Sequence, residues 1–120
     1  MRFVVLYLGV YTTMYLHWVL RGVVDALELF REFYRSLGTP LRAVIEFKLR
    51  RRGTSPAEVL DKPWLLTFYI AQEMGHHNAE LFVSLFVEFA RRWGVDSSLA
   101  SEALRSMEGW RKFVQHLEGV

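Results

Sequence analysis

Two glutamates and two histidines lie close together in the middle of the chain, and their side chains are of the types that bind metal ions. They are Glu73, His76, His77 and Glu80, with spacings of three and four residues. One uninterrupted helix would stack these carboxylates and imidazoles on a single face. The Glu-x-x-His piece resembles half of a di-iron bundle site. The chain has no second Glu-x-x-His, so a complete two-metal site would need two subunits.

Gly75 lies inside this group of four and argues against a metal site. Glycine commonly ends helices, and a break at this point would separate Glu73 from the other three side chains. We therefore predict a polar connection between two helices, with no tightly bound metal and no cofactor. The alternative is a cluster across a subunit boundary, where two copies would supply four carboxylates and four imidazoles.

Other catalytic patterns are absent from the sequence. The chain has no cysteine, which removes disulfides and thiolate chemistry, and it has no Gly-x-Ser-x-Gly elbow. Its eight glycines are scattered singly, so they form no phosphate-binding loop. The serines are explained by helix caps or helix faces. Six serines are explained in this way, namely Ser36, Ser55, Ser84, Ser97, Ser98 and Ser101. We predict a protein that is not an enzyme.

The elements that must position these residues are helices, and the most apolar of them is predicted over Asn78–Trp93. Its polar residues are confined to one line along the helix, while large apolar residues occupy nearly all other positions. A helix of this kind is expected to be surrounded by others, with Asn78 as its N-cap. We therefore expect almost complete burial of Leu81, Leu85, Phe86 and Phe89.

Shorter apolar stripes and capping residues predict the helices around this one. An amphipathic helix is expected over Val23–Leu37, with Thr39 capping the next helix and Gly53 following it. A long last helix carries a stripe from Leu99 to Leu117, with Gly109 as the place where it bends. The predicted ranges are Val23–Leu37, Leu41–Arg52, Ser55–Leu60, Trp64–Met74, Asn78–Trp93 and 97–118. Length and pattern thus predict one all-α domain over residues 1–120, orthogonal or bundle-like, with five to six helices and a core over 23–94.

The apolar stretch Phe3–Leu20 leaves several alternatives open. It contains no residue charged at neutral pH unless His17 is protonated, and its 18 residues are at the short limit for a membrane span. Tyr11 and Tyr15 fall in its middle, whereas membrane aromatics prefer the two interfaces. A helix packed on protein is therefore favoured over a membrane anchor or an initial strand at Arg2–Val10.

Composition bears on partners and compartment. The chain is 52% hydrophobic and 15% aromatic, a surplus that 120 residues cannot fully bury, so self-association as a homo-oligomer is expected. The lack of cysteine favours the cytoplasm. Twelve arginines against three lysines, together with few amides, hint at a thermophile.

A basic run in the predicted helix Leu41–Arg52 supports an alternative function. A nucleic-acid interface would use Arg42, Lys48, Arg50, Arg51 and Arg52. The net charge of only +2 gives this alternative little support. Basic residues at the end of a helix also complement its dipole without any ligand.

Residues 36–94 contain a recognisable order of features. A Leu-Gly pair opens one helix, and a glycine turn leads to a short helix that is closed by an acidic-x-proline step. A glycine then separates the last two helices, and another follows the final one. The matching residues are Leu37, Gly38, Gly53, Leu60, Asp61, Pro63, Gly75, Ala79 and Gly94. This order resembles the small archaeal helical family called Nitrosopumilus output domain 5. The resemblance implies an all-helical module that in some proteins lies behind signalling or regulatory domains, and it implies no catalytic or binding residues.

These observations together favour a non-enzymatic helical module that acts by protein–protein contact, self-associates and serves as a regulatory accessory. The first alternative is a nucleic-acid-associated protein that uses the basic helix over 42–52. The second is a small membrane-anchored protein that uses Phe3–Leu20.

Overall fold

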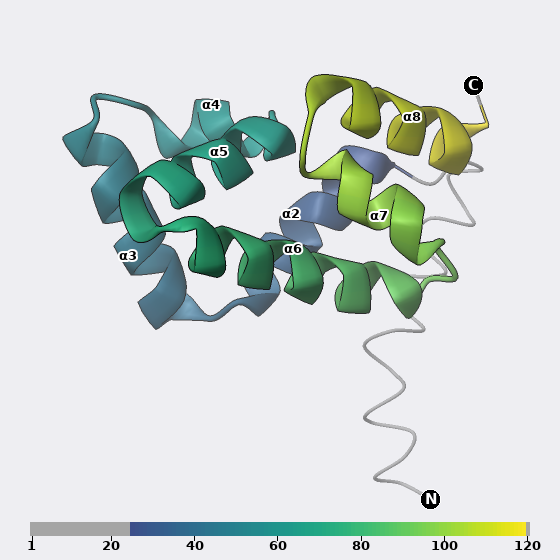
Figure 1. Cartoon of the computed structure of the whole chain (residues 1–120), viewed down its shortest axis with the longest axis horizontal. Helices are drawn as coiled ribbons and strands as arrows, with labels where there is room; N and C mark the ends of the chain where they lie inside the picture. Colours follow the sequence, from purple (N-terminus) through teal and green to yellow (C-terminus); the bar gives the residue numbers. More distant parts are fainter. Residues whose placement is uncertain (1–24, 120) are drawn as a thin grey trace, which may run out of the picture.

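The structure is a computed structural model that describes residues 25–119. These residues form seven α-helices and no strand (Figure 1). The helices are α2 Ala26–Ser36, α3 Thr39–Arg51, α4 Pro56–Leu60, α5 Pro63–Met74, α6 His76–Arg91, α7 Ser97–Ala103 and α8 Met107–Glu118. The all-α fold class is confirmed. The predicted segment Phe3–Leu20 lies outside the described residues.

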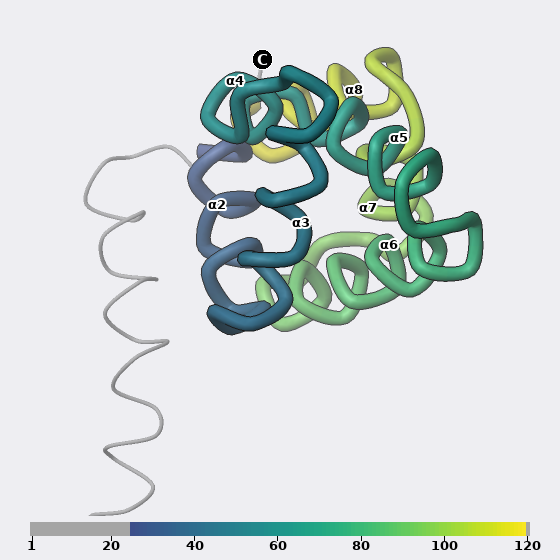
Figure 2. The backbone as a smooth tube through the Cα atoms, turned by 90° about the vertical axis from the view of Figure 1, so that its left-hand side faces the viewer, coloured from purple at the N-terminus to yellow at the C-terminus, as the bar shows by residue number. Residues whose placement is uncertain are grey.

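The number and arrangement of the helices differ from the prediction. Seven helices form within the described residues, where five to six were expected. Helices that follow one another pack as hairpins, α5 with α6 and α7 with α8, and do not form an orthogonal array (Figure 1). Seen from the side, α2 and α3 lie next to each other, with α4 at one end of the pair (Figure 2).

The predicted long helix over 97–118 is two helices. The break lies at Ser106, whose backbone is extended and not helical. Its Oγ accepts a hydrogen bond from the Gly109 amide at 2.9 Å and so caps the N-terminus of α8. Gly109 is not a bend. A Cβ at this position would lie 2.0 Å from the Glu102 carbonyl oxygen, so glycine allows α8 to approach α7 closely.

Helix boundaries differ from the predicted ones by up to three residues. Asp25 caps α2 by accepting from the Leu27 and Glu28 amides, so the helix begins at Ala26. Thr39 is not a cap, because it is already the first residue of α3. At the next break, Gly75 has a φ of 95°, a conformation that favours glycine, and it separates α5 from α6.

Asn78 is likewise not the N-cap of α6. The helix begins two residues earlier, at His76, and Asn78 lies inside its first turn. The Asn78 side chain donates to the Met74 carbonyl oxygen at 2.6 Å. This bond satisfies a carbonyl that the end of α5 leaves without a helical partner.

Aromatic rings from α2, α6 and α8 form the centre of the core. Phe33 of α2 lies 5.4 Å from Phe82 and 5.2 Å from Phe86 between ring centroids, and Phe86 lies 5.7 Å from Phe113 of α8. Phe30 of α2 contacts the same group. Edge-to-face and tilted packing of this kind adds to the apolar burial. The prediction that Phe86 is buried is confirmed, with 0% of its surface exposed.

The other side of α6 contradicts the expectation that this helix is surrounded. Leu81 is 51% exposed and Leu85 is 41% exposed, and Phe89 is only half-buried. Helices α2, α5 and α7 contact α6, and they cover its Phe82 and Phe86 side. No described element covers Leu81 and Leu85, so two leucines remain at the surface.

Candidate functional site

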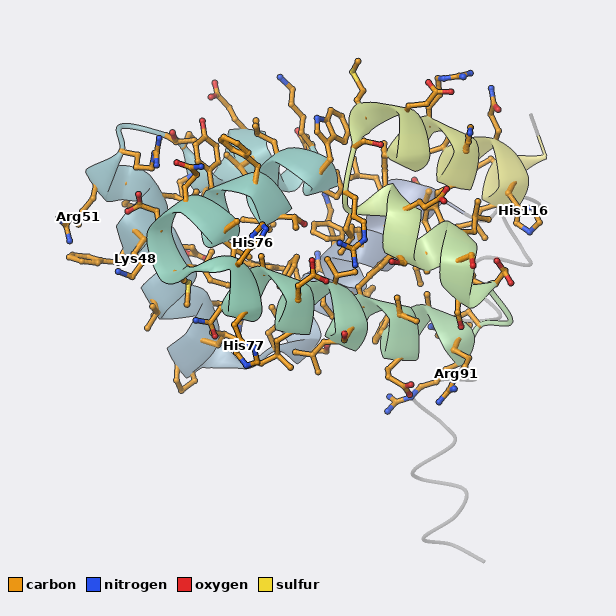
Figure 3. The ribbon with its side chains drawn as sticks, in the orientation of Figure 1. Lys48, Arg51, His76, His77, Arg91 and His116 are labelled. Atoms are coloured by element: carbon orange, nitrogen blue, oxygen red, sulfur yellow. The ribbon has the colours of Figure 1, made fainter. Side chains whose placement is uncertain are left out.

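The four residues of the predicted polar connection lie on two helices, and each carboxylate has a basic partner. Glu73 of α5 accepts from Arg52 at 2.9 Å. Glu80 of α6 accepts two hydrogen bonds from Arg105, both at 2.8 Å. His76 and His77 are exposed in the first turn of α6 and point to different sides of the helix (Figure 3).

This arrangement ties helices together and does not converge on one point. Within residues 25–119 no group of three or more His, Cys, Asp or Glu side chains is placed to hold a metal ion. The hydrogen bonds from Arg105 hold the pKa of Glu80 below its usual range. Glu73 thus links α5 to the end of α3, and Glu80 links α6 to the connection between α7 and α8.

The basic residues of α3 do not share one face. Arg42 lies in a cleft near the start of α3, and Arg50 pairs with Glu46 at 3.6 Å. Lys48 and Arg51 lie at the outer end of the molecule (Figure 3). On a helix of 3.6 residues per turn, the five basic residues of this run are distributed around the axis. A nucleic-acid duplex would therefore contact only some of them.

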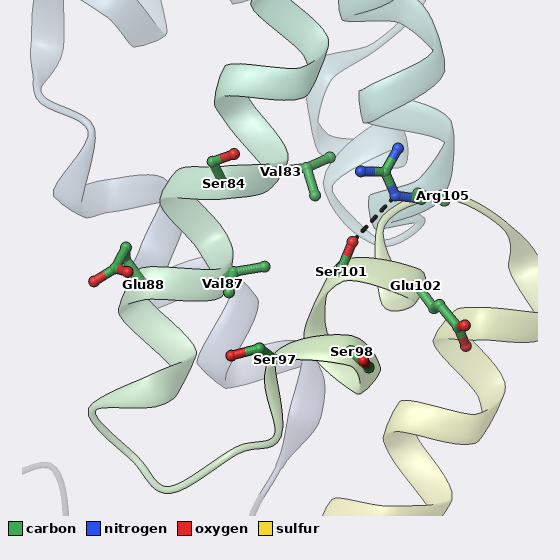
Figure 4. A pocket seen from close by; sticks show the side chains of 9 residues that line it. All are labelled: Val83, Ser84, Val87, Glu88, Ser97, Ser98, Ser101, Glu102 and Arg105. Atoms are coloured by element: carbon green, nitrogen blue, oxygen red, sulfur yellow. Dashed lines mark hydrogen bonds between the residues drawn. The ribbon is translucent and has the colours of Figure 1, made fainter.

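A hollow of about 660 Å³ lies between α6 and α7 (Figure 4). Four serines line it, namely Ser84, Ser97, Ser98 and Ser101, and Ser101 accepts from Arg105 at 3.1 Å. None of its described lining residues is a histidine or a lysine. The titratable residues of the lining are Glu88, Glu102 and Arg105, so the hollow lacks the histidine that most often activates a serine nucleophile.

The most distinctive surface is apolar and spans α3, α5 and α6. We call it the apolar face and define it by a shallow groove of about 50 Å³ together with the exposed side chain of Val44. Eight residues line the groove; seven are apolar, the eighth is Asn78, and none is charged. Its walls are Leu41 and Ile45 from α3, Ile70 and Met74 from α5, and Leu81 and Leu85 from α6.

Helical spacing explains how these side chains meet. Leu41, Val44 and Ile45 fall on one side of α3, and Leu81 and Leu85 are one turn apart on α6. Val44 is 43% exposed at this surface. A groove of this size is well below the roughly 300 to 1,000 Å³ of small-molecule sites.

Sequence analysis missed the apolar face because it assigned every apolar residue of α6 to the core. One signal was present in the pattern. Leu81 and Leu85 are adjacent to Phe82 and Phe86, so two apolar lines run along α6 side by side. A helix that packs against neighbours on one side needs only one apolar line, so the second line indicates apolar side chains that the neighbours do not cover.

No known protein family, curated protein or solved structure matches this chain. The resemblance to Nitrosopumilus output domain 5 therefore stays a prediction. Within the described part of the chain, no helix is both long enough and apolar enough to cross a membrane.

Proposed function

We propose that this protein is a helical protein–protein interaction module that self-associates, with the apolar face as the contact between two copies. The observation that supports it is the exposure of Leu81, Leu85 and Val44 around an uncharged groove. Contiguous exposed apolar surface rimmed by polar residues is typical of interaction sites. A regulatory accessory role fits the same surface, because the module would act through what it contacts.

A second copy suits this face for two physical reasons. The leucines at 81 and 85 form a ridge of the kind that packs into a neighbouring groove, and the groove lies directly beside it. In a two-fold dimer each copy can place its ridge in the groove of the other. Because no charged residue lines the groove, two identical surfaces meet without like-charge repulsion.

The interface needs more area than these leucines supply. Stable contacts bury about 800 Å² per partner, which takes roughly 20 to 30 residues a side. The apolar segment Phe3–Leu20 is the part of the chain that we expect to extend the contact, since it carries no side chain charged at neutral pH apart from a protonated His17. Self-association would then also cover the surplus of apolar residues in the composition.

The test is the mass of the full chain in solution, by sedimentation equilibrium or light scattering. We expect a mass twice that of one 14.1 kDa chain, and the mass of one chain for the double variant Leu81→Asp with Leu85→Asp. The matched control is Met107→Asp on α8, where the side chain is 66% exposed away from the groove. A wild-type mass of one chain at about 100 µM would contradict the proposal, as would a double variant that stays dimeric.

Nucleic-acid association is the second candidate function, and one observation favours it. The Arg51 guanidinium lies 6.0 Å from the centroid of the exposed Phe47 ring, and Arg52 lies 5.1 Å from that of Tyr69. Exposed aromatic rings beside cations are typical of surfaces that bind single strands. Binding of this kind should weaken as salt rises and should be reduced in Arg51→Gln. No binding of duplex or single strand at low salt would exclude it.

A further inference from the structure

Three arginines line a cleft of about 390 Å³ between α2, α3 and α4. Arg31 and Arg35 are four residues apart and therefore share one face of α2, while Arg42 reaches the cleft from the first turns of α3. Two carboxylates line the same cleft, from Glu46 and Asp61. Its charged lining residues therefore carry a net charge of +1.

Two of the arginines are exposed and pair with carboxylates that an anion can replace. Arg31 pairs with Asp61 at 2.5 Å, and Arg35 pairs with Glu32 on the same helix. The side chains of Arg31 and Arg35 are 45% and 61% exposed. Ion pairs this exposed contribute little to stability, so exchanging the carboxylate for a bound anion costs little.

Arg42 differs from the other two because it forms no ion pair with a carboxylate of the described chain. Its Nε donates to the Gly38 carbonyl oxygen at 3.4 Å and its Nη2 donates to the Thr39 hydroxyl at 3.3 Å, both long hydrogen bonds. The side chain is half-buried. A guanidinium in this position has donors to spare inside a partly desolvated cleft.

The Glu46 carboxylate in the cleft is already occupied. It accepts from the Tyr34 hydroxyl at 2.8 Å and pairs with Arg50 at 3.6 Å. Burial of Tyr34, followed by its bond to Glu46, raises the pKa of that hydroxyl well above its usual range. The Tyr34 hydroxyl therefore stays protonated and continues to donate its hydrogen bond to Glu46. Arg42 is then available to bind an anion from solution.

We propose that this cleft binds a small phosphoanion, with Arg42 as the main donor and Arg31 and Arg35 completing the site. The planar guanidinium donates two parallel hydrogen bonds that match the oxygens of a phosphoryl group. Ala57 and Leu60 of α4 also line the cleft and offer apolar contact to an organic group. The volume exceeds that of an inorganic ion, which favours a phosphate monoester. The site is separate from the apolar face and does not rest on self-association.

Titration of the full chain with inorganic phosphate and with phenyl phosphate, followed by calorimetry, tests this site. We expect saturable binding of one ligand per chain with a Kd of about 1 mM or tighter. Tighter binding of phenyl phosphate would identify a monoester as the ligand, and equal binding would identify the free ion. No saturable binding of either anion up to about 20 mM would overturn the proposal.

Single substitutions locate the binding. Arg42→Gln should raise the Kd about tenfold or more, and Arg35→Gln, at an exposed position that does not support the fold, should raise it as well. Asp61→Asn should tighten binding because it frees Arg31. The matched control is Arg91→Gln, which removes the same charge from an exposed pair with Glu88 on α6. Equal losses in Arg42→Gln and Arg91→Gln would show only general charge attraction and would overturn the site.

Discussion

Replacing Phe86 by alanine tests the core at a ring that joins three helices, α2, α6 and α8. Phe86 lies on α6 with none of its surface exposed, and its ring centroid is 5.9 Å from Phe30, 5.2 Å from Phe33 and 5.7 Å from Phe113. The change would therefore remove contacts of α6 with both α2 and α8. These rings come from opposite ends of the described chain, so collapse around the cavity requires whole helices to move.

The magnitude follows from these contacts. Truncation of a buried phenylalanine to alanine costs about 3 to 5 kcal/mol, with the larger values where the surroundings cannot close the cavity. Each lost aromatic pair is worth roughly 0.5 to 1.5 kcal/mol beyond its buried area. We therefore expect a loss of about 4 to 5 kcal/mol in the free energy of unfolding. A domain of ordinary stability, about 5 to 15 kcal/mol, would be left marginally folded.

Urea unfolding followed by circular dichroism measures this loss, with wild type and variants at one low concentration. Phe86→Leu keeps most of the volume and should cost less than Phe86→Ala. Leu81→Ala, at a position 51% exposed on the same helix, should cost less than about 1 kcal/mol. A loss below about 1 kcal/mol for Phe86→Ala, or equal losses for Phe86→Ala and Leu81→Ala, would refute the reasoning.

Three further predictions concern other parts of the chain. Deleting residues 1–22 should lower solubility or change the mass in solution, because Phe3–Leu20 is expected to cover or supply apolar surface; unchanged stability and mass would exclude that role. Arg105→Gln should return the pKa of Glu80 toward its usual value, measured by NMR titration. In the wild type the lowered pKa of Glu80 stabilises the folded state at pH values above the pKa that Glu80 has in the unfolded chain. This stabilisation is lost as the pH falls through the pKa of Glu80 in the folded protein. The variant should therefore lose less stability on acidification than the wild type. Elemental analysis of protein purified without an affinity tag should show no stoichiometric metal, and metal that disappears in His76→Ala would contradict this.

The helices were predictable where local chemistry decides them. Gly75 separates α5 from α6 at the predicted break, and Asp96 caps α7 where the predicted helix over 97–118 begins. A positive φ and a side-chain acceptor are local requirements, so the sequence shows them directly. The break before α8 was missed because the apolar stripe from Leu99 to Leu117 keeps its period across it. Residue 106 could either continue the helix or cap a new one. The close approach of Gly109 to the Glu102 carbonyl, which depends on tertiary packing, accompanies the capped form.

The candidate surfaces were less predictable than the fold. The apolar pattern of α6 includes Leu81 and Leu85. Periodicity alone cannot distinguish a helix that is covered on every side from one that leaves such residues exposed. The arginine cleft has no local signature either. Arg35 and Arg42 belong to different helices, and the turn at Gly38 brings them together, so their proximity follows from the packing of α2 against α3.

Helix α3 positions both surfaces, and this makes the two proposals separable. Only Ile45 and Leu49 of its 13 residues are buried, so core burial holds it less firmly than α2 or α6. Leu41 lines the apolar groove, while Arg42 lines the arginine cleft. Consecutive residues on a helix point about 100° apart, so neighbouring positions serve different surfaces. A dimer that persists in Arg42→Gln while phosphate binding is lost would therefore assign each property to its own side of one helix.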